Sequence, residues 1–100
     1  MNNFFVYILF SESLNRFYTG LTTLKVEERL ENHLHKKYAG SNFTQKANDW
    51  TLFHSIKCKS FSQARNIELH VKRMKSSSYI KNLKLYPELQ QKLLDQYKNT

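Results

Sequence analysis

The feature that most constrains the fold is an unbroken apolar and aromatic run at residues 4–10, Phe-Phe-Val-Tyr-Ile-Leu-Phe. A strand covered on both faces has a continuous hydrophobic sequence, whereas a strand with one wet face alternates. The run is too short to span a bilayer, and it lacks the basic start and the small-residue cleavage site of a signal peptide. We therefore predict a buried strand at the centre of a sheet.

Two further segments have strand character. Residues 16–21 follow a polar loop at hairpin distance and are rich in aromatic and β-branched side chains, so the first two strands are expected to be antiparallel neighbours. Gly20 is expected to end or kink the second strand. After a loop at residues 38–49, a third strand is predicted at residues 50–58.

Helical signals fill the rest of the chain. Thr22 or Thr23 can cap a first helix, whose inner face carries Val26, Leu30 and Leu34.

Later helices are also signalled. The capping-box pattern of Ser60 and Gln63 starts a helix over residues 60–75. A short helix through Leu85 and a terminal helix that begins near Pro87 are expected to follow. The order β-β-α-β-α-α, with room for an extra C-terminal helix, predicts an α+β fold in which a small three-stranded antiparallel sheet packs with helices. We expect one domain at residues 1–85, with a C-terminal helix at residues 86–100 packed on it.

The charge of the chain favours a polyanionic partner. The chain has sixteen Lys and Arg residues and eight Asp and Glu residues. Its formal net charge is therefore +8, and the basic residues are spread along its 100 residues. Cys58 stands alone, so neither an intrachain disulfide nor a cysteine-based zinc cluster can form. A lone cysteine is typical of a reducing compartment, and we expect the protein to be cytoplasmic and not bound to a membrane.

Glu68 lies where an apolar residue is expected. The stripe around it repeats at helical spacing and consists of Ala64, Ile67, Val71 and Met74. Burial of an unpaired carboxylate costs several kcal/mol, so a buried carboxylate implies a cation, a proton or a metal ion nearby. An ion pair with Lys72, four residues on, is an equally good explanation, and the sequence does not choose between the two.

Four other polar residues could lie near one another. Arg29 and His33 are neighbours on the surface of the first helix and could reach over the sheet. Tyr7 and Tyr18 lie in strands that should pair, so their phenols could meet if the register places both on one helix-facing side. Taken singly, each tyrosine is better explained as a core residue.

These residues together resemble a known family. The signature motifs of the GIY-YIG nucleases are matched by Phe5-Val6-Tyr7 and by Tyr18-Thr19-Gly20, and Arg29, His33 and Glu68 follow in the family's order. The chain resembles in particular the small stand-alone members related to the nuclease module of the excision-repair endonuclease. The resemblance covers residues 4–83. Phe5 replaces the first glycine and Thr19 replaces the isoleucine, but no reactive group is lost.

The resemblance implies a GIY-YIG-like fold and a metal-dependent endonuclease of DNA, with a link to DNA repair. Glu68 would hold one divalent ion, Mg²⁺ or alternatively Mn²⁺, together with water and phosphate oxygens. Arg29 would neutralise charge on the phosphate. A tyrosine would act as the base with help from His33 or a nearby cation. Tyr7 is favoured for this role, and Tyr18 would support the placement of water or phosphate.

Basic residues outside this set are expected to hold the nucleic-acid backbone. These are Lys36, Lys37, Lys46, Lys72, Arg73 and Lys75, with Lys81 and Lys84 in the same basic stretch. Trp50 is expected to pack within the domain, and His35, His54 and His70 are expected to be surface or structural residues.

Several alternatives stay open at this point. A non-catalytic nucleic-acid-binding module of the same fold would need the basic residues but not Glu68. Within these 100 residues we expect no separate DNA-reading domain, and we therefore expect the protein to recognise a DNA structure, to cut with little discrimination, or to obtain its target from a partner protein. The sequence does not distinguish DNA from RNA and does not give the oligomeric state.

Overall fold

The computed structural model of the protein describes residues 4–23 and 47–98. In chain order it contains β1 (Phe4–Ser11), β2 (Arg16–Thr22), β3 (Trp50–Cys58), α2 (Phe61–Met74), α3 (Ser77–Leu85) and α4 (Pro87–Gln96). The predicted α+β class with a three-stranded antiparallel sheet is confirmed. The helix predicted around Val26, Leu30 and Leu34 lies outside the described residues.

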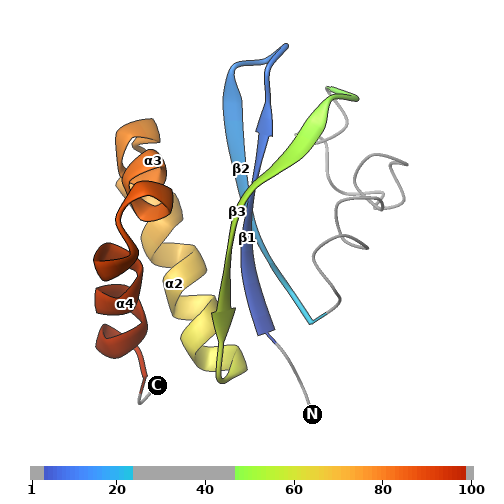
Figure 1. Ribbon diagram of the computed structural model, residues 1–100. Helices are drawn as coiled ribbons and strands as arrows, with labels where there is room; N and C mark the ends of the chain where they lie inside the picture. Colours follow the sequence, from blue (N-terminus) through green and yellow to red (C-terminus); the bar gives the residue numbers. More distant parts are fainter. Residues whose placement is uncertain (1–3, 24–46, 99–100) are drawn as a thin grey trace.

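The apolar run forms the middle strand of the sheet, as its sequence predicts. The strand order is β2-β1-β3, and both pairings are antiparallel (Figure 1). Against β2, Tyr7 lies opposite Gly20 and Leu9 lies opposite Tyr18. Against β3 the register shifts between Ile8 and Leu9, which marks a β-bulge in that pair.

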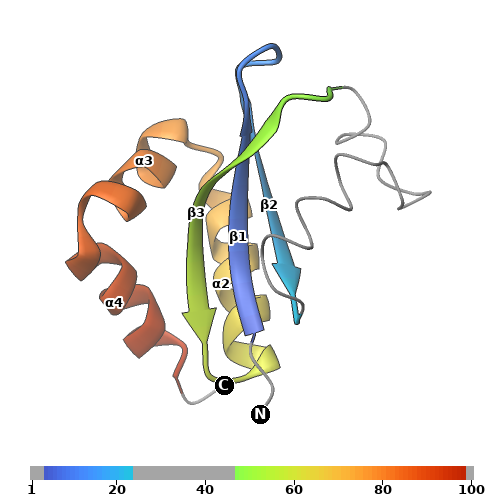
Figure 2. The same ribbon diagram turned by 45° about the vertical axis from the view of Figure 1, so that its right-hand side comes forward.

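The two faces of β1 pack in two separate clusters. On one face, Val6 and Ile8 pack with Ile67 and Val71 of α2 and with the buried apolar residues of α3 and α4. Figures 1 and 2 show α2 lying along this face of the sheet, with α3 and α4 on the outer side of α2 and near β3. On the opposite face, Tyr7 and Leu9 pack with Ala47 and Trp50. Because both faces are covered, β1 can be apolar throughout.

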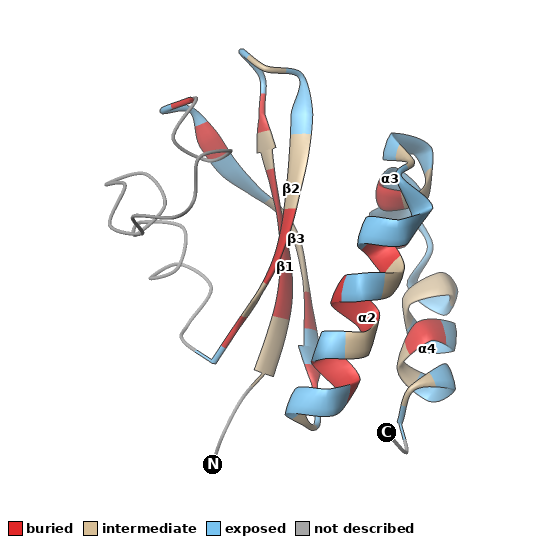
Figure 3. Ribbon diagram, turned by 180° about the vertical axis from the view of Figure 1, so that it is seen from behind, coloured by how far each residue is buried: buried red, intermediate tan, exposed pale blue. Residues whose placement is uncertain are grey.

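Helix α2 begins as predicted and ends with an exposed residue. The Ser60 hydroxyl accepts a hydrogen bond from the Gln63 amide at 3.1 Å, and the Gln63 side chain accepts one from the Lys59 amide at 2.7 Å. The buried stripe of the helix faces the sheet in Figure 3. The prediction that Met74 belongs to this stripe is wrong, because its side chain is 44% exposed in the last turn, beyond the part of α2 that the core covers.

Helix α4 is held to the rest of the described molecule by apolar packing and by three polar contacts made by α4 or by the residue after it. Leu93 is buried in the cluster between the helices and the sheet. The Gln63 side-chain amide donates to the Leu94 carbonyl at 2.9 Å, and His54 Nε2 lies 2.6 Å from Gln90 Oε1. His70 Nδ1 lies 3.1 Å from the Tyr97 hydroxyl, just after α4. A domain boundary at residue 85 stays a prediction.

The start of β3 is tied to the turn between β1 and β2. Asp49 accepts hydrogen bonds from the Ser11 hydroxyl at 2.6 Å and from the Ser13 amide at 2.8 Å. These bonds, the Ser11 hydroxyl first, hold the pKa of the Asp49 carboxyl below its usual value. This link fixes the end of the sheet next to Trp50.

Candidate active site

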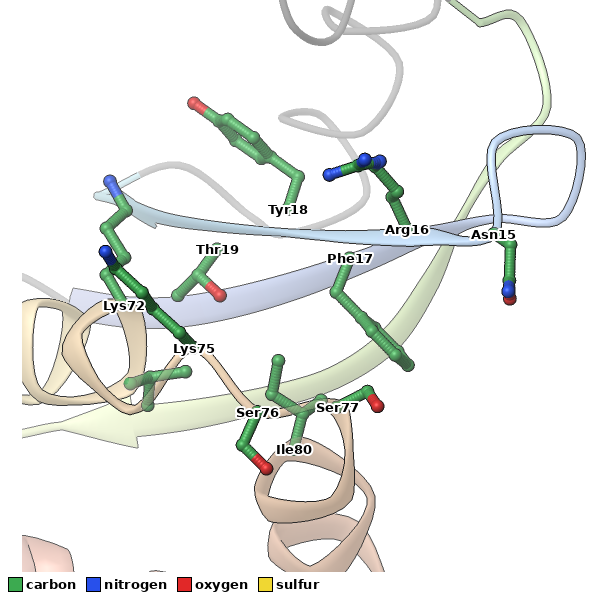
Figure 4. Close-up of a pocket in the computed structure, with 11 residues that line it drawn as sticks. Asn15, Arg16, Phe17, Tyr18, Thr19, Lys72, Lys75, Ser76, Ser77 and Ile80 are labelled. Carbon is green, nitrogen blue, oxygen red and sulfur yellow. The ribbon is translucent and has the colours of Figure 1, made fainter.

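The structure places the two motif tyrosines side by side on one face of the sheet. The rings of Tyr7 and Tyr18 have centroids 6.4 Å apart, and Trp50 packs edge-on against Tyr18 at the same centroid distance. This face is opposite the one that α2 covers, since residues alternate along β2. In Figure 4, Tyr18 points away from α2 and α3, while Phe17 and Thr19 point towards them.

Gly20 makes room for Tyr7. It lies directly across from Tyr7 in the register, and a Cβ atom built on Gly20 would overlap the end of the Tyr7 ring, with Cε1 only 2.8 Å away. The prediction that Gly20 ends or kinks β2 is wrong, because β2 continues to Thr22 and no described glycine has a positive φ. The glycine is needed for the space above it and not for its backbone freedom.

The two phenols differ in their access to solvent. Tyr7 is fully buried, whereas Tyr18 is partly exposed. A group that removes a proton from water must touch that water. Of the two, Tyr18 has the better access from solvent.

Glu68 is buried and ion-paired. It is 5% exposed, its Oε1 accepts from Arg65 at 2.7 Å, and its Oε2 lies 3.2 Å from the Lys72 ammonium. The predicted pair with Lys72 is therefore present. Arg65 was missed by the sequence analysis, although it stands three residues before Glu68, a spacing that favours such a pair. Both cations are about half exposed, so the carboxylate sits at the margin of the core with its charge balanced from outside.

Lys72 connects Glu68 with the edge of β2. Besides pairing with Glu68, it lines a groove together with Tyr18 and Thr19 (Figure 4). Helix α2 packs on the sheet face opposite the two tyrosines. A reactive centre that combines Glu68 with Tyr18 would therefore have to form around the edge of β2, which is an outer strand of the sheet.

Several predicted site residues cannot be placed. Arg29, His33, Lys36, Lys37 and Lys46 lie outside the described residues, so their roles stay predictions. The other predicted basic residues lie within the described part of the chain and are exposed. Lys72 and Arg73 are in the last turn of α2, and Lys75 follows it. Their binding role also stays a prediction.

The acidic and soft ligands in the described part of the chain do not form a metal cage. No group of three or more His, Cys, Asp or Glu side chains is gathered there. Among residues 4–23 and 47–98, Glu68 supplies the one buried carboxylate, and each of its oxygens is paired with a cation that is about half exposed. This arrangement fits a hard divalent ion that is bound mainly by water and phosphate oxygens, with one protein carboxylate.

The remaining conspicuous residues are structural. Trp50 is 2% exposed, which confirms the prediction that it packs within the domain. His54 and His70 hold α4 in place through the contacts described above. Burial raises the pKa of the Cys58 thiol to about 11, so the thiolate needed for nucleophilic chemistry is not populated at neutral pH. His35 lies outside the described residues.

Comparison with known proteins gives the family of the chain. Across residues 4–23 and 47–98, no helix is both long enough and apolar enough to cross a membrane. No curated protein and no solved structure shows significant similarity to the sequence. The family model for the GIY-YIG catalytic domain matches residues 3–83, a span that includes both tyrosine motifs and Glu68. The chain therefore belongs to the GIY-YIG nuclease superfamily.

Proposed function

We propose that this protein is a metal-dependent endonuclease that hydrolyses DNA phosphodiester bonds, with selectivity for a DNA structure or with weak sequence specificity. The observation that carries the proposal is the pairing of Tyr7 and Tyr18 on one sheet face, over a glycine that leaves room for the Tyr7 ring. The register sets Gly20 of the second motif opposite Tyr7 of the first, so the two motifs meet on this face. The formal charge of +8 supports a polyanionic substrate.

Tyr18 is the better candidate for the base. Its partial exposure gives it access to an attacking water, whereas the fully buried Tyr7 can orient Tyr18 and shape the face. A phenol with a usual pKa of about 10 needs a neighbouring cation or an imidazole to accept a proton at neutral pH. Lys72 lines the same groove as Tyr18, and His33 keeps its role as an assisting group. This division of labour reverses the preference for Tyr7 that the sequence suggested.

Arg29 and Glu68 complete the proposed chemistry. The guanidinium of Arg29 would hold a non-bridging phosphate oxygen and balance the charge that develops as water attacks phosphorus. Glu68 would hold the divalent ion, Mg²⁺ or Mn²⁺, after its carboxylate exchanges Lys72 or Arg65 for the metal. The bound ion supplies charge neutralisation on the phosphate and on the leaving oxygen. The released Lys72 would then be available to a phosphate group.

Replacement of Glu68 tests the role of the metal. Glu68→Ala should abolish Mg²⁺-dependent cleavage of a labelled DNA panel that contains linear, branched and single-stranded substrates. Folding should be preserved, because the two freed cations are about half exposed and can be solvated. DNA affinity, measured in EDTA, should be largely unchanged. Glu88→Ala, which removes an exposed carboxylate from α4, is the matched control. Cleavage by Glu68→Ala at the rate of the parent would refute the assignment.

Removal of single hydroxyl or guanidinium groups tests the chemical step. Tyr18→Phe should slow cleavage by about two to four orders of magnitude under single-turnover conditions, the usual contribution of a general base. Arg29→Ala should also slow this step strongly. Tyr7→Phe should have a smaller effect if it only orients Tyr18. Equal losses for Tyr7→Phe and Tyr18→Phe would argue against the assignment of the base.

The alternative is a nucleic-acid-binding module that does not cut. The full engagement of the Glu68 carboxylate by Arg65 and Lys72 favours this reading, because an ion-paired carboxylate has a structural role without any metal. Binding that weakens with salt, together with no cleavage in Mg²⁺ or Mn²⁺, would support the module.

A further inference from the structure

A basic groove runs beside β2 on the side that faces the helices. It has a volume of about 620 Å³ and lies between β2 and the junction of α2 and α3 (Figure 4). Its lining residues are Asn15, Arg16, Phe17, Tyr18, Thr19, Val71, Lys72, Lys75, Ser76, Ser77 and Ile80. Three of them are cationic and none is acidic, so the groove suits an anionic occupant.

Two of the three cations have no counter-ion in the described part of the chain. Lys72 pairs with Glu68, but no described residue pairs with Arg16 or Lys75, and both are exposed. Lys75 also has a left-handed backbone, with φ 48° and ψ 38°, at the end of α2. Glycine adopts this conformation more readily than lysine does, so local backbone preference does not explain the lysine.

Aromatic side chains form the floor beyond these cations. Phe17 lines the groove and also an adjoining hollow of about 260 Å³, together with Phe10, Phe53 and Lys81. The ring of Phe17 lies 4.8 Å from that of Phe10 and 5.0 Å from that of Phe53, centroid to centroid. All three rings are only partly buried. Lys84 holds its ammonium 4.6 Å from the Phe53 ring centre, which adds a cation at the far end.

We propose that this groove binds an unpaired DNA strand, with its phosphates on Lys75 and Lys81 and its bases against the aromatic floor. Arg16, whose side chain points to the same side of β2 as Tyr18 (Figure 4), would hold a further phosphate at the edge of β2. A positively charged groove with interleaved aromatic rings is the arrangement that single strands use, because an unstacked base can offer its face to a ring. The bases of a duplex are stacked inside it and cannot reach such a floor. An acidic peptide would use the cations but would leave the rings unexplained.

The proposal rests on the proposed function and narrows its substrate class. Tyr18 borders the groove, but its ring points to the opposite face of the sheet, which carries Tyr7. A DNA strand in the groove would therefore pass around the edge of β2 beside Tyr18. The preferred substrate would then carry an unpaired segment next to the bond that is cut, as a flap or a branch does.

Fluorescence anisotropy with a labelled oligothymidylate tests the groove directly. The measurement is made in EDTA, so that binding is separated from cleavage, and a blunt duplex of equal length is the comparison. Lys75→Gly suits the test because glycine tolerates the left-handed backbone, and its melting temperature should not fall. Lys75→Gly and Lys81→Ala should each weaken oligothymidylate binding. Each should also reduce the slope of log K against log salt by about 0.7, the value for one lost single-strand phosphate contact.

Matched substitutions elsewhere on the surface serve as controls. Lys92→Ala removes the same charge from the exposed side of α4 and should change affinity less than about twofold. Phe17→Leu should weaken oligothymidylate binding at least about fivefold, with an unchanged salt slope, because a stacking partner and not a charge is lost. Phe61→Leu, at the 54% exposed Phe61 at the start of α2, should leave affinity unchanged.

Each outcome decides a separate question. If Lys75→Gly, Lys81→Ala and Phe17→Leu all leave oligothymidylate binding unchanged, the proposal that the groove binds a single strand is wrong, even if the protein cuts DNA. Displacement of the oligothymidylate by a polyglutamate peptide as effectively as by unlabelled DNA would overturn the choice of occupant, and an oligouridylate that binds more tightly would point to RNA. Absence of cleavage in Mg²⁺ with all predicted binding losses intact would overturn the endonuclease proposal and leave the groove standing.

Discussion

At the residue scale, the contact between Gly20 and Tyr7 links the motif to the packing of the sheet. Each strand contributes one member of the pair, and the pairing register sets them opposite one another. The tyrosine ring occupies the space that any larger residue at position 20 would need. The glycine of the second motif is thus explained by the tyrosine of the first.

Gly20→Ala should destabilise the protein and disturb the sheet face that carries Tyr7 and Tyr18. The added methyl group overlaps the Tyr7 ring, and overpacking of this kind usually costs about 1–3 kcal/mol. The free energy of unfolding from urea titrations, together with single-turnover cleavage, measures both effects. In a Tyr7→Leu background the same glycine substitution should cost clearly less, because the overlapping ring atoms are gone. An equal cost in both backgrounds would show that Tyr7 is not the cause.

At the element scale, the sequence predicts the elements well and the faces of the strands poorly. Each strand and helix that is described was predicted to within a few residues, because apolar runs, the Ser60 cap and Pro87 mark their bounds directly. The face on which Tyr7 lies could not be read from β1, since a strand that is apolar on both sides shows no alternation. Gly20 was misread for a related reason, because the space it leaves depends on a residue of another strand.

Sequence patterns also could not predict the contacts between different helices. The Glu68–Lys72 pair follows from spacing within one helix, and so in principle does the missed Arg65. The bonds from α2 to the region of α4, such as that between His70 and Tyr97, join residues far apart in the chain. Only the fold brings these residues together.

The packing of His70 predicts a dependence of stability on pH. His70 lies against the rings of Tyr79 and Tyr97, and burial, with a smaller effect from Arg73, lowers its pKa from 6.5. The unfolded chain then binds the proton more readily than the folded chain does. The contribution of His70 to stability is therefore complete above about pH 6.5 and is lost as the pH falls through the lowered pKa.

Melting temperatures measured between about pH 8 and about pH 5 check this effect. The wild-type protein should lose stability on acidification more steeply than His70→Gln, which keeps a polar group near the Tyr97 hydroxyl but does not titrate. Parallel curves for the two proteins would assign the acid sensitivity to other groups.

At the scale of the whole molecule, α4 is expected to be part of the same folding unit as the sheet. Leu93 is 3% exposed within the cluster that joins the helices to β1 and β3, so Leu93→Ala should lower the free energy of unfolding by about 2–5 kcal/mol. Leu85→Ala, at a residue that is 68% exposed, should change it by less than about 0.5 kcal/mol. Urea unfolding of both variants makes the comparison. A small effect for Leu93→Ala would mean that α4 is an accessory to a domain that ends before it.

The two-sided packing of β1 has a consequence for how the protein can fail. A slip of one residue along its neighbours would send Tyr7 towards the helices and bring Val6 and Ile8 to the face of Tyr18. Such a misaligned chain would lose its core and its reactive surface in one event. Under the proposed function, partly folded copies of this basic protein would be inactive, and only a correctly assembled sheet would cut DNA.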